Sequence, residues 1–286
     1  MRKQYTQNIK SMVVKVGTSV LTKGGFFDKS MILRLSSEFS RFLKKGVHVY
    51  VVSSGAIGSG MTILKIKKRP TQMCELQASA AVGQRYLMQC YEEAFSRYGF
   101  STAQVLLTWE DLARRERFLN AKHTLHQIQA WGLVPIINEN DTVATDEIRF
   151  GDNDRLSALL AILVQADVLV ILSATNGLYA DGKKHEHKSR IPVVQKVGHS
   201  VFRHVKERKN SFTVGGMRSK LSSVSVCTRA GIPVFLADGR ERDVLTHIFN
   251  AQDVGTLFVP ESVTASRKNW IRTFTDLVAA RRKRSA

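Results

Sequence analysis

Cysteine is scarce in this sequence, which contains only Cys74, Cys90 and Cys227 among its 286 residues. The three are odd in number and far apart, so they match neither the spacing of a zinc site nor a disulfide framework. No apolar stretch is long enough to cross a bilayer, since the run at residues 164–172 is interrupted by two polar residues. The first ten residues are polar and lack the apolar centre of a signal peptide. These absences predict a globular protein of the cytoplasm that is not bound to a membrane.

Acidic residues are also in deficit, with 24 Asp and Glu against 43 Lys and Arg, which gives a net charge of +19. Such an excess is compatible with nucleic-acid binding, with a membrane surface, or with attraction of anionic small molecules. The basic residues are scattered in short groups, for example at 65–69, 183–184 and 281–284. Scattering of this kind is typical of solvated loops and helix faces. A nucleic-acid partner therefore stays an alternative rather than the prediction.

The motifs of several other enzyme classes are missing. The sequence contains no Gly-x-x-x-x-Gly-Lys-Ser/Thr phosphate loop, no dinucleotide fingerprint and no Gly-x-Ser-x-Gly elbow. Residues 152–154 look like the start of a calcium loop, but Leu156 and Leu163 stand where the third ligand and the bidentate Glu should be. We therefore predict no metal site built from protein side chains.

Strand and helix patterns alternate along most of the chain. Near-continuous aliphatic runs are typical of strands buried on both faces, and they lie at residues 12–16, 47–53, 102–107, 133–137, 167–172 and 232–236. Helical patterns separate them at residues 30–44, 73–98, 114–130 and 154–165. This alternation predicts a three-layer α/β/α sandwich with a mainly parallel central sheet. The polar segments 142–149 and 181–196 are predicted to form surface hairpins.

The composition changes after Pro260. Residues 261–286 combine an apolar stripe at helical spacing with the basic run at 281–284. An amphipathic stripe predicts a C-terminal helix that docks on the domain. The alternative is a tail for a membrane surface or for nucleic acid.

Two strand ends combine glycine with polar or charged side chains. Lys15 lies in an otherwise apolar strand that ends at Gly17, and a lysine there is costly unless it is paired or emerges at the carboxyl edge of the sheet. Ligands bind at that edge in open α/β sheets. Ser53, Ser54 and Gly55 repeat the design at the next strand. Backbone N–H groups at such corners predict an anion site.

Three later segments carry further candidate residues. The glycine pair at 215–216 opens a helix with Lys220 in its first turn, where the helix dipole disfavours a cation unless an anion lies nearby. Such a local misfit is expected at a functional site. Residues 137–141 and 151–154 place Asp and Asn beside Gly at strand-to-helix corners, a chemistry suited to a small polar amino acid beside a phosphate chain.

These segments, in this order, resemble the amino acid kinase family over roughly residues 10–260, and within it the branch that phosphorylates L-glutamate. The resemblance is carried by residues 15–19, 53–57, 115–121, 137–143, 151–154 and 215–217, together with Lys220. It implies an amino acid kinase domain at residues 10–260. Residues 261–286 are too few for the PUA-type domain of many bacterial relatives.

The resemblance implies ATP-dependent phosphorylation of the γ-carboxylate of L-glutamate to L-glutamyl 5-phosphate, the first step of proline biosynthesis. ATP and Mg²⁺ are the implied cofactors, with Mg²⁺ carried by the phosphates. A homo-oligomer and functional coupling to a glutamyl-phosphate reductase are also implied. The alternatives are a sister kinase acting on aspartate, N-acetylglutamate or carbamate, and a non-catalytic basic protein that binds nucleic acid. Asp141 favours glutamate or aspartate, because its carboxylate suits a free ammonium group.

By the same resemblance, Ser54, Asp141 and Asn153 are expected to bind glutamate. Lys15 and Lys220 would neutralise charge on the phosphates, and Asp154 would hold the two lysines. The implied ATP site comprises Lys15, Gly17, Ser173, Ala174, Val214, Gly215, Gly216, Met217, Arg218, Ser219 and Lys220. One departure is residues 173–175, which lack the acidic residue that these kinases often place beside the nucleotide.

Overall fold

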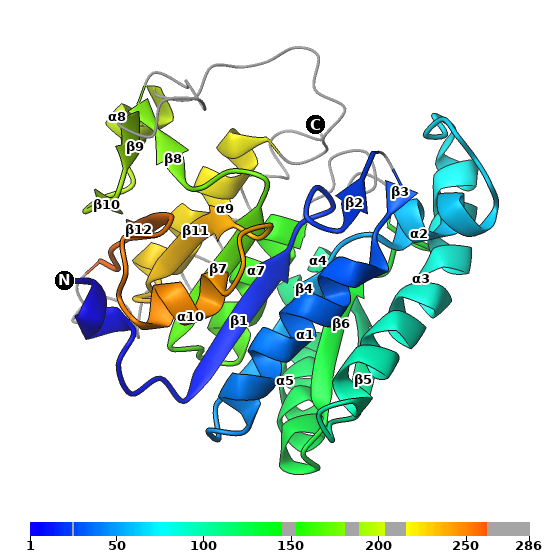
Figure 1. The fold of residues 1–286 in the computed structure, drawn as a ribbon, viewed down its shortest axis with the longest axis horizontal. Helices are drawn as coiled ribbons and strands as arrows, with labels where there is room; N and C mark the ends of the chain where they lie inside the picture. Colours follow the sequence, from blue (N-terminus) through cyan, green and yellow to red (C-terminus); the bar gives the residue numbers. More distant parts are fainter. Residues whose placement is uncertain (25, 145–152, 181–188, 204–215, 262–286) are drawn as a thin grey trace.

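The computed structural model describes residues 1–24, 26–144, 153–180, 189–203 and 216–261, and its centre is one eight-stranded sheet (Figure 1). The strand order is β10-β12-β11-β7-β1-β4-β6-β5. Neighbouring strands run parallel except β11 and β12, which run antiparallel. The strands are β1 (Ser11–Val16), β4 (His48–Ser53), β5 (Thr102–Leu107), β6 (Val134–Glu139), β7 (Val168–Ser173), β10 (Val193–Val194), β11 (Val234–Asp238) and β12 (Thr256–Phe258). The prediction of a mainly parallel sheet between helices is confirmed.

Helices cover both faces of this sheet. They are α1 (Lys29–Leu43), α2 (Ala56–Ile63), α3 (Met73–Ser96), α4 (Trp109–Ala113), α5 (Arg115–Ala130), α7 (Asn153–Leu163), α8 (His199–Arg203), α9 (Met217–Arg229) and α10 (Val244–Phe249), preceded by the 3₁₀ turn η1 (Arg2–Tyr5). Two small antiparallel pairs lie outside the main sheet: β2 (Thr22–Lys23) with β3 (Phe26–Phe27), and β8 (Leu178–Tyr179) with β9 (Arg190–Ile191).

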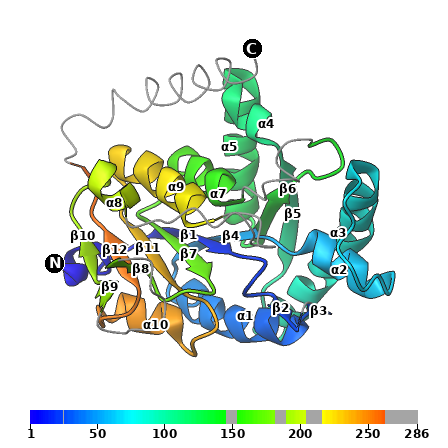
Figure 2. The same cartoon turned by 90° about the horizontal axis from the view of Figure 1, so that it is seen from above.

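Side chains of β1 alternate between two hydrophobic cores, as the period of a strand requires. Met12, Val14 and Val16 belong to the core shared with α1, α3 and α10. Val13 belongs to the core shared with α5, α7 and α9. Figure 2 shows α7 and α9 on one face of the sheet and α1 and α10 on the other. The alternation directs Lys15 toward the same face as Val13, where α7 lies.

The six predicted strands and four predicted helices are all present, with bounds that differ by a few residues. The helix α4 was not predicted, because five residues are too few to show a period. Its start is nevertheless marked by a capping box, in which Thr108 and Asp111 bond each other's backbone N–H groups.

The prediction of a surface hairpin at residues 181–196 was wrong for the C-terminal part of this segment. Val193 and Val194 join the edge of the main sheet beside β12 instead of forming part of a surface hairpin. Val194 is buried there, and this burial outweighs the polar composition of the surrounding segment. β8 and β9 do form an antiparallel pair. Residues 145–149 of the other predicted hairpin and residues 262–286 of the predicted C-terminal helix lie outside the described residues.

The helices α2 and α3 touch through two glycines. A Cβ atom on Gly60 would lie 1.8 Å from the backbone oxygen of Ser79, and one on Gly83 would lie 1.9 Å from the backbone oxygen of Ala56. No larger residue fits without separating the helices. This close contact determines where the start of α2 lies relative to the sheet.

Gly60→Ala is therefore expected to lower the free energy of unfolding by about 2 kcal/mol or more, because the added methyl group overlaps backbone atoms. Gly58→Ala is the matched control on the same helix, where a Cβ atom would lie 3.8 Å from Thr22 Cγ2, an ordinary contact. Alanine's higher helix propensity should leave that variant as stable as the parent, or more so. Urea unfolding curves check both variants, and equal stability of the two would contradict the packing argument.

Candidate active site

Polar residues converge where parallel strands end at one edge of the sheet. The carboxyl ends of β1, β4, β6 and β7 meet there, as parallel pairing requires. The helices α7 and α9 start at the same edge. Of the predicted site residues, the structure brings together Lys15, Ser54, Asn153, Asp154 and Lys220 through hydrogen bonds and ion pairs.

The centre of the site is a buried cluster of three charged groups. Lys15 Nζ lies 2.8 Å from Asp154 Oδ1, and Lys220 Nζ lies 2.8 Å from Asp154 Oδ2. Asp154 is fully buried, and both lysines are almost so. Burial raises the pKa of the Asp154 carboxyl group, but the two ammonium groups outweigh burial and hold this pKa below its usual value. The cluster therefore carries one net positive charge in a place that disfavours uncompensated charge.

Local structure explains how these groups meet. Asp154 lies in the first turn of α7, where a carboxylate is favoured by the helix dipole. Lys220 lies in the first turn of α9, where the dipole disfavours a cation. Local chemistry predicted an anionic ligand beside Lys220, and the resemblance implied that Asp154 holds both lysines; in the structure the partner of Lys220 is the carboxylate of Asp154. Part of the local misfit is thus resolved within the protein.

Asn153 organises a second, uncharged group of residues next to the cluster. Its Nδ2 lies 3.1 Å from the backbone oxygen of Ser53, 3.0 Å from Ser54 Oγ and 3.0 Å from Asn138 Oδ1. The backbone of Ser54 in turn donates to the oxygen of Val16, next to Lys15 in the sequence. These bonds join the ends of β1, β4 and β6 to the start of α7.

Three members of this network, Asn138, Gln84 and Tyr91, were not predicted to be site residues. Asn138 Nδ2 donates to Gln84 Oε1 at 2.8 Å, and Ser53 Oγ lies 2.9 Å from the hydroxyl group of Tyr91. Asn138 lies within a segment that carried the resemblance, so a signal was present. Gln84 and Tyr91 lie on α3, far away in the sequence and without a motif around them.

Two buried amide atoms of this network, Asn153 Oδ1 and Gln84 Nε2, have no hydrogen-bond partner among the described residues. Buried polar atoms are nearly always paired in folded proteins, and each exception calls for an explanation such as a catalytic role, a water or an ion. Asn153 Oδ1 can accept a hydrogen bond, and Gln84 Nε2 can donate one.

Two glycines shape the backbone around the charged cluster. A Cβ atom on Gly17 would lie 3.4 Å from Lys15 Nζ and 3.1 Å from the backbone oxygen of Leu172, so glycine keeps the space beside the ammonium group open. Gly55 has a φ angle of 109°, which only glycine adopts without strain, and it is the residue that precedes α2. The first N–H groups of α2 therefore follow directly after Gly55, one residue beyond Ser54.

Asp141 lies in the turn after β6 and is half-buried. Gln77 of α3 fixes this turn by donating to the backbone oxygen of Ala144 at 3.2 Å. Burial raises the pKa of Asp141 to about 6, although the charge of Arg69 opposes that shift. Arg69 is a further residue that sequence reasoning missed. Burial lowers the pKa of its guanidinium group, and the charge of Asp141 acts in the opposite direction.

The remaining predicted residues are those expected to contact the nucleotide. Ser173 is the last residue of β7, and its Oγ is 3.0 Å from Thr175 Oγ1. Gly216 precedes α9, whose first residues are Met217, Arg218 and Ser219. Val214, Gly215 and residues 151–152 lie outside the described residues, as does the rest of the loop before α9.

Within the part of the chain that the structure describes, no group of three or more His, Cys, Asp or Glu side chains is arranged to hold a metal ion. Among the same residues, no helix has both the length and the apolar character needed to cross a membrane.

Comparison with known proteins agrees with this architecture. The model of the amino acid kinase family matches residues 10–238, and the chain therefore belongs to that family. Among its relatives, the glutamate 5-kinase of Thermoanaerobacter sp. is 43% identical over 263 residues, which cover 91% of this chain and 71% of the relative. The glutamate 5-kinase of Methylobacillus flagellatus is 44% identical over 267 residues, covering 92% and 72%.

A solved structure also shares the fold. The UMP kinase of Bacillus anthracis superposes with a TM-score of 0.57 over 89% of this chain and 97% of that protein, at 15% sequence identity. At that identity the likeness concerns the fold alone.

Proposed function

We infer that this chain is a glutamate 5-kinase, which transfers the γ-phosphoryl group of ATP to the γ-carboxylate of L-glutamate and so begins proline synthesis. The observation that carries the proposal is the buried Lys15–Asp154–Lys220 cluster beside the Asn153–Ser54 network. A cationic cluster suits the phosphates, and neighbouring amide and hydroxyl groups suit the acceptor. The identity to several glutamate 5-kinases supports the choice of acceptor.

The strand order supports a location of the two proposed subsites side by side. β1, which carries Lys15, lies between β7 and β4. The proposed nucleotide residues Gly17 and Ser173 lie at the ends of β1 and β7, whereas Ser54 follows β4 on the other side. The transferred phosphoryl group would then lie over the end of β1, between its donor and its acceptor. This is the arrangement that in-line transfer requires.

The chemistry requires positioning and charge neutralisation more than proton transfer. The γ-carboxylate of glutamate is already an anion at neutral pH, so the reaction needs no general base. Lys15 and Lys220 would offset the repulsion between the negatively charged carboxylate of glutamate and the negatively charged phosphates. Their ion pairs with Asp154 hold the two ammonium groups in place. Groups held in this way stabilise developing charge without reorganisation.

Mg²⁺ fits this site only as a companion of ATP. Both oxygens of Asp154 are occupied by lysines, and the described residues offer no carboxylate cage. Phosphate oxygens and waters would supply its ligands, as is usual for Mg²⁺. Once bound, the ion would neutralise part of the phosphate charge.

Glutamate recognition would use the side chains of Ser54, Asn153 and Asp141. Ser54 Oγ accepts a hydrogen bond from Asn153, which leaves the hydroxyl proton to donate to a carboxylate oxygen of the substrate. Asp141 would accept from the ammonium group. An acetylated amine carries no charge and would leave Asp141 without a partner.

The KM for glutamate should fall about 10-fold between pH 5 and pH 7, because Asp141 pairs with the ammonium group only when ionised and a group with a pKa near 6 becomes about tenfold more ionised over that range. The pKa of Asp141 is about 6, so the carboxylate fraction rises across this range. Asp141→Asn should raise KM and make it insensitive to pH over the same interval. Initial-rate kinetics at fixed saturating ATP measure both profiles, with the KM for ATP as control. A glutamate profile of unchanged shape in Asp141→Asn would contradict the assignment.

The proposal is tested by ADP release from the purified protein with Mg²⁺-ATP and, in parallel, L-glutamate, L-aspartate or N-acetylglutamate. We expect turnover with glutamate far above that with the other two acids. Turnover with N-acetylglutamate equal to that with glutamate would refute the role of Asp141, and no turnover with any of the three would refute the proposed function.

A further inference from the structure

A second charged element lies at the same edge of the sheet, beside β7 rather than β1. Asp238, the last residue of β11, is paired in register with Ser173 of β7. Its carboxylate accepts from Arg240 Nε at 2.9 Å and from Arg240 Nη2 at 2.6 Å. Arg240 Nη2 also donates to the backbone oxygen of Ala174 at 3.1 Å. Three bonds therefore fix the plane of one guanidinium group against the ends of two strands.

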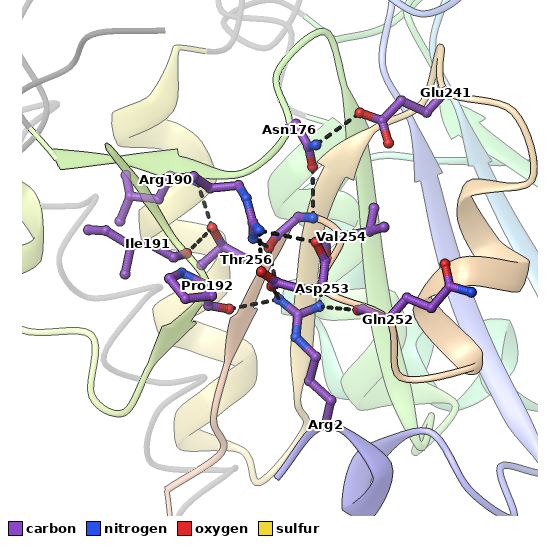
Figure 3. Close-up of polar contacts among 12 residues, drawn as sticks. Arg2, Asn176, Arg190, Ile191, Pro192, Glu241, Gln252, Asp253, Val254 and Thr256 are labelled. Carbon is purple, nitrogen blue, oxygen red and sulfur yellow. Dashed lines mark hydrogen bonds and ion pairs between the residues drawn. The ribbon is translucent and has the colours of Figure 1, made fainter. Parts of the chain in front are cut away.

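A second connection ties the same two segments together. Asn176 Nδ2 donates to Glu241 Oε1 at 2.9 Å, and Asn176 Oδ1 accepts from the backbone N–H of Gly255 at 2.7 Å (Figure 3). Residues 174–176 and 240–241 are thus linked twice. The two links hold the segment that carries Arg240 in a fixed position against the segment after β7.

The electrostatics of Arg240 differ from those of the lysine cluster. Its hydrogen bonds to Asp238 raise the pKa of the guanidinium group, which stays a cation whose charge is balanced by the carboxylate. The Arg240 side chain is 54% exposed, whereas that of Asp238 is 13% exposed. A balanced, planar and half-exposed cation is a poor phosphate ligand. A flat guanidinium face is a good surface for an aromatic ring to stack on.

The separation between Arg240 and the lysine cluster matches the distance between the base and the phosphates of a nucleotide. The order β11-β7-β1 puts Asp238 two strands from the strand of Lys15. At about 4.8 Å between neighbouring strands, this separation is roughly 10 Å. With the phosphates at Lys15 and Lys220, the base of an extended ATP molecule would reach the ends of β7 and β11.

We propose that Arg240, held by Asp238 and by the backbone of Ala174, is the stacking platform for the purine base of the nucleotide. This inference rests on the proposed function, because it assumes a nucleoside triphosphate whose phosphates face the two lysines. It also gives a role to the departure at residues 173–175: the charged side chains beside the base come from Asp238 and Arg240, at the end of the neighbouring strand.

The test compares binding of ADP and of inorganic tripolyphosphate to the full chain by titration calorimetry, in the absence of any acceptor acid. Arg240→Ala should weaken ADP binding about 10-fold, the usual loss when a base loses its stacking partner. Tripolyphosphate binding should stay unchanged, because the polyphosphate has no base. Arg242→Ala is the matched control, an exposed arginine two positions along the chain.

Each outcome has a distinct meaning. Equal losses for ADP and tripolyphosphate would refute stacking, and so would unchanged ADP binding. Arg240→Lys keeps the cation and the stem but not the plane, so it should weaken ADP binding as well, and it replaces Arg240→Ala if that variant has a lower Tm. Because no acceptor is present, the result stands even if the chain does not phosphorylate glutamate.

Discussion

Lys15→Met is expected to lower kcat about 10²- to 10³-fold, the usual cost of removing one fixed group that stabilises transition-state charge. Stability should not fall with it. Lys15, Asp154 and Lys220 together carry one net positive charge in the interior, and loss of one lysine leaves a neutral pair. Methionine fills a similar volume, and burying it costs no charge. The expected result is thus an inactive protein with an unchanged or slightly higher Tm.

Steady-state kinetics with glutamate and ATP, together with thermal unfolding, measure the two effects. Lys220→Met should behave in the same way, because Lys220 contacts the other oxygen of Asp154 at the same distance. Lys23→Met is the control, an exposed lysine on β2. Near-normal turnover in both buried variants would remove the basis of the proposed mechanism.

Asp154→Asn should have the largest effect on stability. It leaves two buried ammonium groups facing a neutral amide, and breaking a buried ion pair in this way costs about 3–5 kcal/mol. Activity should be lost as well, since the lysines lose the group that holds them. Asp243→Asn provides the control, because Asp243 pairs with Arg41 at the surface, and such pairs contribute about 1 kcal/mol or less.

Urea unfolding at pH 7 measures the loss, and a triple variant separates charge from packing. Lys15→Met, Asp154→Leu and Lys220→Met combined replace the whole cluster with apolar side chains. That protein should recover most of the lost stability and remain inactive, because apolar replacement of a buried ionic group is often neutral or stabilising. A fully stable Asp154→Asn variant would show that the cluster is not energetically coupled in the way its geometry implies.

Much of the fold could be predicted because its strands are buried on both faces. Such strands read as aliphatic runs in the sequence, and their alternation with helices restricts the sheet to a mainly parallel one. The short elements could not be predicted in this way. β10 has two residues, and its place beside β12 is set by burial of Val194 against distant parts of the chain.

The candidate site was less predictable from the sequence than the fold was. Lys15 was identified from local chemistry alone, because a cation in an apolar strand requires a partner. The roles of Asp141 and Asn153 came from a resemblance and remain proposals. Gln84 and Arg240 carried no local signal, since ordinary polar residues on a helix or a loop look the same whether they contact solvent or a site.

The sequence by itself determined the strands, their alternation with helices, and the residues that local physics leaves unsatisfied, such as Lys15 and Lys220. These properties depend on neighbours within a few positions along the chain. The resemblance implied that Asp154 holds both lysines, but the contact itself, across the 66 positions between Asp154 and Lys220, is made by the tertiary structure. Only the tertiary structure placed Arg240 beside Ala174, again 66 positions away. Contacts of that separation depend on strand order, and strand order follows from the packing of the whole sheet rather than from any one segment.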